Sequence, residues 1–75
     1  MIIYKLTKCY FETEYDDLGL FRTEEGLLKK VRDTLVNKYI SLVLINGTVY
    51  YKKEDKTYPL YEYIVDIIDT DKLED

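Results

Sequence analysis

The chain has no histidine and no tryptophan, and its 75 residues include one cysteine, one proline and three glycines. Without histidine it lacks the commonest general base near neutral pH and the commonest metal ligand. Cys9 has no second cysteine to pair with and no histidine to activate it, so we interpret it as a small, partly buried hydrophobe. We therefore expect no enzymatic activity, no metal and no cofactor.

The opening MIIYKLTK has no apolar stretch long enough for a signal peptide or a membrane span, which predicts a cytoplasmic protein. With 47% hydrophobic and 35% charged residues, the composition is that of a folded chain. We find no repeat or linker, so residues 1–75 are expected to form one small domain, with a frayed acidic tail at 70–75. A domain of this size buries about 60% of the surface of its unfolded chain.

The net charge of −4 is unevenly distributed. Residues 1–21 sum to −2, residues 22–56 to +3 and residues 57–75 to −5. A chain of this sign repels the phosphate backbone, so we expect no direct binding of nucleic acid. Four basic residues of the predicted helix could contact phosphate, but a charged outer helix face has the same composition; they are Lys29, Lys30, Arg32 and Lys38.

Two elements are predicted in the first half of the chain. Residues 2–12 alternate apolar and polar side chains with the period of a half-buried strand. The acidic stretch that follows, ETEYDDLGL, reads as a strand end and an exposed loop, because its carboxylates match no metal-binding spacing. A helix over 24–39 is capped by Thr23, and its apolar stripe is Leu27, Leu28, Val31, Leu35 and Tyr39.

The segment LVLINGTVYY predicts a β-hairpin, since Asn46-Gly47 suits a two-residue type I′ turn. Such a turn also sets the register, with Ile45 opposite Thr48, and then Leu44 opposite Val49, Val43 opposite Tyr50 and Leu42 opposite Tyr51. One face of this hairpin is entirely apolar and should meet the helix; it consists of Leu42, Leu44, Val49 and Tyr51.

Residues 60–69 are ambiguous. A helix from Pro59 to Asp69 would gather Glu62, Asp66 and Asp69 on one stripe, whereas a strand would place Glu62 and Asp66 on the face of Leu60, Ile64 and Ile68. We therefore predict an α+β fold in the order β-α-β-β-(β)-α, with the central helix packed on a short antiparallel sheet. The alternative is β-α-β-β-β, with the C-terminal segment as a strand.

The nine tyrosines and the acidic C-terminal segment suggest surfaces for a protein partner. Val43, Ile45 and Tyr50 lie on the second hairpin face and form the candidate face of a homodimer. A row of carboxylates could also imitate phosphates and dock on a basic protein. The candidate residues for partner binding are Glu62, Asp66, Asp69, Asp71, Tyr50, Tyr58 and Tyr61.

These features predict a small acidic, non-enzymatic protein-binding module. In size, charge and tyrosine content the chain is similar to the inhibitors that viruses and phages direct at host nucleic-acid machinery, although the similarity is one of composition. It implies a basic nucleic-acid-binding protein as the partner. The alternative is a structural or regulatory homodimer that pairs through the exposed hairpin face.

Overall fold

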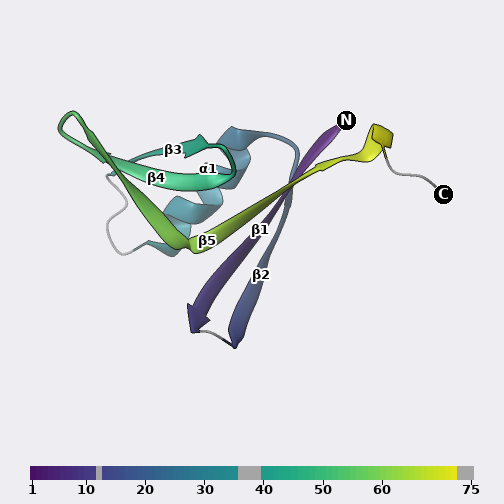
Figure 1. Cartoon of the computed structure of the whole chain (residues 1–75), viewed down its shortest axis with the longest axis horizontal. Helices are drawn as coiled ribbons and strands as arrows, with labels where there is room; N and C mark the ends of the chain where they lie inside the picture. Colours follow the sequence, from purple (N-terminus) through teal and green to yellow (C-terminus); the bar gives the residue numbers. More distant parts are fainter. Residues whose placement is uncertain (12, 36–39, 73–75) are drawn as a thin grey trace.

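A single helix packs on one face of a five-stranded antiparallel sheet in the computed structural model, an α+β arrangement (Figure 1). The structure describes residues 1–11, 13–35 and 40–72. Along the sheet the strands follow the order β2-β1-β5-β4-β3. The elements are β1 (Ile2–Phe11), β2 (Glu14–Phe21), α1 (Glu24–Thr34), β3 (Ser41–Ile45), β4 (Thr48–Lys53), β5 (Lys56–Asp69) and a 3-10 turn, η1 (Thr70–Lys72).

The long strand β5 joins two hairpins into one sheet. β1 and β2 form the first hairpin, and β3 and β4 form the second. β5 pairs with β1 from Ile2–Asp69 to Lys8–Tyr63, and its first part pairs with β4. In Figure 1 it crosses the middle of the molecule, with β4 on one side and β1 on the other.

The β3–β4 hairpin confirms the predicted turn and register. Asn46 and Gly47 adopt φ angles of 50° and 79°, the positive values that a type I′ turn requires. All four predicted cross-strand pairs are present, from Ile45–Thr48 to Leu42–Tyr51. A side chain at position 47 would need this unfavourable φ, and its Cβ would lie 3.4 Å from the carbonyl oxygen of Val65.

The helix begins where the sequence predicts but ends earlier. The Thr23 hydroxyl accepts a hydrogen bond from the Gly26 amide at 3.0 Å, as an N-cap does. At the other end, the Thr34 hydroxyl donates to the Val31 carbonyl oxygen at 2.7 Å, and Leu35 is already extended. The prediction that the helix continues through Leu35 is therefore wrong, and the remaining predicted residues, 36–39, lie outside the described part of the chain.

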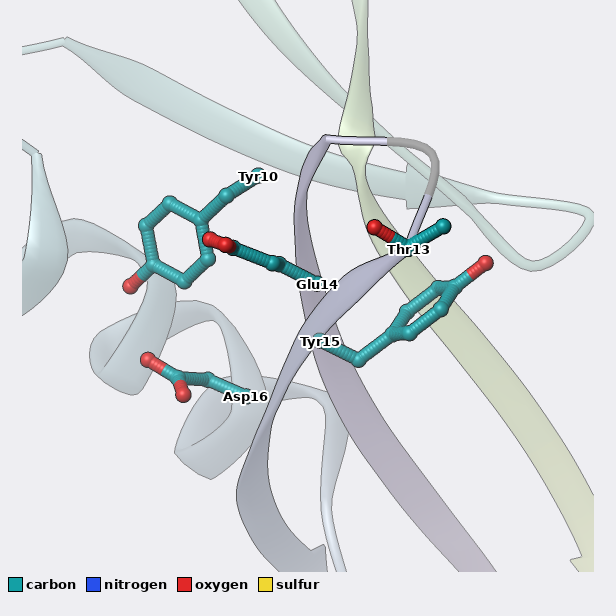
Figure 2. A pocket seen from close by; sticks show the side chains of 5 residues that line it. All are labelled: Tyr10, Thr13, Glu14, Tyr15 and Asp16. Atoms are coloured by element: carbon teal, nitrogen blue, oxygen red, sulfur yellow. The ribbon is translucent and has the colours of Figure 1, made fainter.

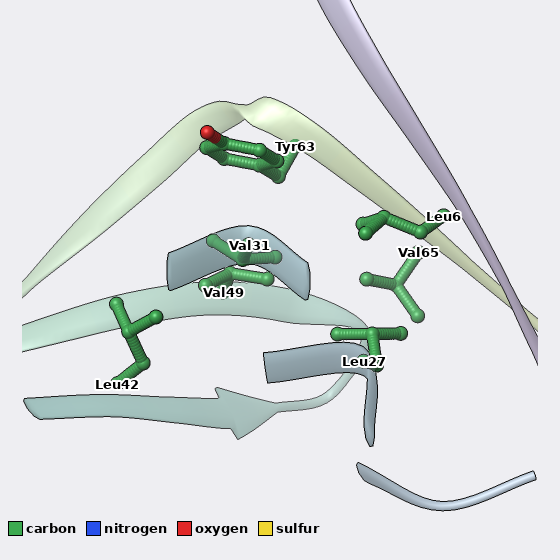
Figure 3. Packing of buried hydrophobic residues seen from close by; sticks show 7 residues of the cluster. All are labelled: Leu6, Leu27, Val31, Leu42, Val49, Tyr63 and Val65. Atoms are coloured by element: carbon green, nitrogen blue, oxygen red, sulfur yellow. The ribbon is translucent and has the colours of Figure 1, made fainter. Parts of the chain in front are cut away.

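The core lies between α1 and the sheet (Figure 3). Leu27 and Val31 of α1 are fully buried, as the predicted apolar stripe requires. The predicted inner face of the second hairpin also contributes, because Leu42 and Val49 are buried and Leu44 and Tyr51 pack against them. The buried side chains are Leu6, Leu27, Val31, Leu42, Val49, Tyr63 and Val65.

The segment predicted as a strand end and loop is instead the edge strand β2. Its acidic residues are tolerated because an edge strand faces solvent and because Asp16 stands directly opposite Lys8 of β1. The register shifts near Leu18 and Gly19, where φ of Gly19 is +115° and its amide donates to the Asp17 carboxylate. This irregularity lets a glycine-containing acidic segment remain in the ladder.

The predicted C-terminal helix is wrong, because residues 56–69 form β5. Burial along this strand alternates: Tyr63 and Val65 are buried against α1, whereas Ile64 and Asp66 are exposed on the other side. The carboxylates that favoured a helix can therefore share a strand face with isoleucines, since that face points away from the core. Pro59 lies beside the irregular pairing between β5 and β4, where a missing amide donor is tolerated.

Candidate interaction surface

The sheet face that points away from α1 is the main candidate site, and we call it the open face. Its members are Ile3, Lys5, Thr7, Asp17, Leu20, Val43, Ile45, Thr48, Tyr50, Ile64, Asp66 and Ile68. Its members alternate along each strand with the buried residues Leu6, Val49 and Val65, so they project to the opposite side. No described element covers this side of the sheet. Several of its apolar side chains are strongly exposed, including Ile64 at 40%, Ile45 at 45% and Leu20 at 64%.

The predicted homodimer residues all belong to the open face. Val43 and Tyr50 are cross-strand partners, and Ile45 is paired with Thr48. Thr48 is in turn paired with Ile64 of β5, so the apolar surface continues from the second hairpin into the centre of the sheet. The sequence identified one end of this surface.

Of the part of the open face on β1 and β5, the sequence-based candidates include Asp66 alone. Here three cross-strand pairs stand side by side: Ile3–Ile68, Lys5–Asp66 and Thr7–Ile64. Leu20 of β2 lies beside Lys5 and extends the surface to the sheet edge. The alternation in IIYKLTKCY indicates which side chains share a face, but their partners on β5 depend on long-range pairing.

The predicted row of carboxylates does not form one stripe. Asp66 is on the open face opposite Lys5, and Glu62 lies in β5 near its irregular pairing with β4. Asp69 and Asp71 lie at the end of the sheet beside the N-terminus, where the ammonium group of Met1 is 3.9 Å from Asp69 and hydrogen-bonded to Asp71. The predicted stripe depended on helical spacing. In the strand the same carboxylates lie at separate places on the molecule.

The candidate tyrosines also occupy different places. Tyr58 stacks on Tyr51 with a centroid distance of 5.1 Å, on the side of the sheet that carries α1. Tyr61, in β5, is 77% exposed. Tyr50 is therefore the one candidate tyrosine that the cross-strand pairs place on the open face with Val43 and Ile45.

The free end of the β1–β2 hairpin carries a hollow lined by Tyr10, Thr13, Glu14, Tyr15 and Asp16 (Figure 2). Tyr10, Glu14 and Asp16 project to one side of β2 and Tyr15 to the other. The ammonium group of Lys8 lies 5.0 Å from the ring centroid of Tyr10 and 5.4 Å from that of Tyr63. A hydrogen bond to the Asp16 carboxylate raises the pKa of the Tyr10 hydroxyl above its ordinary value.

The Tyr10–Asp16 contact leads to a titration prediction. The hydrogen bond stabilises the neutral hydroxyl, so its contribution to folding is complete below the ordinary tyrosine pKa of about 10 and is lost as the pH rises through the raised value. The Asp16→Asn variant should lower the pKa of Tyr10. The measurement is the chemical shift of the Tyr10 ζ carbon against pH, assigned with Tyr10→Phe. A Tyr10 titration midpoint that is the same in the Asp16→Asn variant would contradict the contact, and Tyr15→Phe serves as the control.

Comparison of the chain with protein-family models, with curated proteins and with solved structures finds no match. Within the described ranges, no cluster of three or more cysteine, aspartate or glutamate side chains is placed to hold a metal ion. None of the helical residues that the structure describes forms a segment long and apolar enough to cross a membrane.

Proposed function

We propose that the chain is a non-enzymatic protein-binding module that contacts its partner through the open face. The observation that supports this proposal is the exposure of Leu20, Ile45 and Ile64 on the side of the sheet that α1 leaves uncovered, whereas α1 buries a core on part of the other side. Contiguous exposed apolar surface on a small protein is characteristic of interaction sites. Ile64 is central to it, because it connects the β1–β5 part to Thr48 and the second hairpin.

The chemistry of the open face suits association with another folded surface. Aliphatic side chains supply area that is removed from water, and Tyr50 adds a large rigid ring with a polar end. Lys5 and Asp66 add one charge of each sign, which favours an opposing surface of mixed charge over a uniformly basic groove. We therefore favour a partner surface of mixed charge over a basic nucleic-acid-binding protein, which is the partner that the composition led us to expect.

Site-specific photo-crosslinking tests whether the open face meets a protein. A benzophenone amino acid is placed at position 64 or, as a matched control, at position 67, in cells that make the chain. Both positions hold exposed isoleucines of β5, at 40% and 54%, but Ile67 is on the α1 side of the sheet. We expect a covalent protein adduct from position 64 and much less from position 67. Equal yields, or no adduct from position 64, would contradict the proposal.

A further inference from the structure

We infer that the partner of the open face is the open face of a second copy of this chain, placed so that Lys5 of each copy meets Asp66 of the other. This inference rests on the proposed function and specifies its partner.

Lys5 and Asp66 are direct cross-strand neighbours at the centre of the sheet. Both side chains are exposed, and both lie on the open face, because the adjacent residues Leu6 and Val65 are buried beneath α1. Within the described residues neither forms an ion pair, since the ion pairs found there involve the ammonium group of Met1. One positive and one negative group therefore stand side by side between the pairs Ile3–Ile68 and Thr7–Ile64, and Asp17 of β2 lies opposite Thr7.

This arrangement is complementary to itself about one two-fold axis. An axis parallel to the strands, between the two sheets and midway between β1 and β5, places β1 of one copy over β5 of the other. Lys5 then faces Asp66 of the partner subunit, and the same contact is repeated on the other side of the axis. An axis perpendicular to the strands at this level would instead place like charges together, which is unfavourable.

The same axis also matches the apolar side chains. Within one chain Ile3 pairs with Ile68 and Thr7 with Ile64, and the axis places β1 of one copy over β5 of the other. Ile3 therefore faces Ile68 of the partner subunit, and Thr7 faces Ile64 of the partner subunit. The strand order places β2 of one copy on the β4 side of the other. Leu20 lies there at the level of Lys5 and Asp66, just before β4 begins at the level of Ile64, and Tyr15 lies further along. Val43 and Ile45 on β3 then lie at the margin of the contact.

The molecule measures 45, 29 and 18 Å along its principal axes. A standard stable interface buries about 800 Å² on each partner, so a stable dimer needs the side chains around Lys5 and Asp66 as well as that pair itself. Two sheets packed in this way lie about 10 Å apart and form the core of a β-sandwich, with the helices on the outside.

Charge reversal tests the inference, with mass in solution measured by sedimentation equilibrium. The wild-type chain should form a dimer of twice 9.0 kDa at tens of micromolar. Lys5→Asp and Asp66→Lys should each raise the dissociation constant by at least about tenfold, because each creates two like-charge contacts across the axis. An equimolar mixture of the two variants should form a heterodimer, since every contact again joins opposite charges; isotope labelling of one variant identifies it by native mass spectrometry.

Three results would overturn the inference: a wild-type chain that is monomeric at 500 micromolar, single reversals that dimerise as wild type does, or a mixture that remains monomeric. If a reversal unfolds the chain, Lys5→Gln and Asp66→Asn replace it. Each should raise the dissociation constant of the dimer about threefold, and an unchanged dissociation constant overturns the inference.

Ile64→Lys should also separate the copies, whereas Ile67→Lys should not. A position-64 crosslink to a different protein would retain the proposed function and reject the homodimer.

Discussion

Replacing Leu6 by alanine should lower the free energy of unfolding by about 3 to 5 kcal/mol. Leu6 lies in β1, is fully buried, and pairs with Val65 of the central strand. The substitution removes three buried carbon atoms and leaves a cavity between the sheet and α1 that the surrounding backbone cannot fill. For a domain of this size the loss approaches the whole stability, so the variant should be largely unfolded at 37 °C.

Leu20 provides the matched control. It lies on β2, the strand beside β1, but is 64% exposed on the open face. Leu20→Ala should therefore change stability by about 0.5 kcal/mol or less at a protein concentration where the chain is monomeric. Urea titrations of both variants, followed by circular dichroism, give the comparison. A loss of less than about 1 kcal/mol for Leu6→Ala would mean that the core is not where the structure places it.

The second large effect is expected at Tyr63, whose ring and hydroxyl can be tested separately. The ring is buried beside Val31 and Val49, and the hydroxyl is hydrogen-bonded to that of Thr34 at the end of α1. Because the Thr34 hydroxyl donates to the Val31 carbonyl oxygen, the Tyr63 hydroxyl acts as the donor to Thr34. Tyr63 thus connects the central strand to the point where the helix ends.

Tyr63→Ala should lower the free energy of unfolding by about 3 to 5 kcal/mol, and Tyr63→Phe by about 1 kcal/mol, because the phenylalanine keeps the ring and loses the hydrogen bond. Tyr61→Ala, at a side chain that is 77% exposed on the same strand, should change it by about 0.5 kcal/mol or less. Thermal unfolding of the three variants separates these contributions. Equal losses for Tyr63→Phe and Tyr63→Ala would show that the ring contributes nothing to the core.

Local chemistry made the helix start and the second hairpin predictable. Thr23 caps the helix through a hydrogen bond to a residue three positions away, and Asn46-Gly47 adopts positive φ angles that few residue pairs accept. Both signals act within a few residues and do not depend on the rest of the fold. The register of the second hairpin follows from its turn, which is why the side of the sheet that carries Val43, Ile45 and Tyr50 was predicted correctly.

The remaining elements depend on partners that are distant in sequence. We predicted a helix for residues 60–69 because a strand would place carboxylates and isoleucines on one face. That arrangement needs a sheet face that nothing covers, and local spacing does not show whether such a face exists. The acidic segment of β2 becomes a strand because β1 is there to pair with it. The juxtaposition of Lys5 and Asp66 follows from a register between residues more than 60 positions apart, so the centre of the open face could not be identified from the sequence.

The central position of β5 also determines the order in which the fold can be completed. The other four described strands form two hairpins whose pairing is local, so each can form early, whereas β5 is synthesised after them and must insert between β1 and β4. Closing the pairing of Leu6 with Val65 brings together distant parts of the chain, which is characteristically slow. Until then β1 and β4 each expose an unpaired edge, so the nascent chain is most prone to aggregate just before residues 56–69 are available.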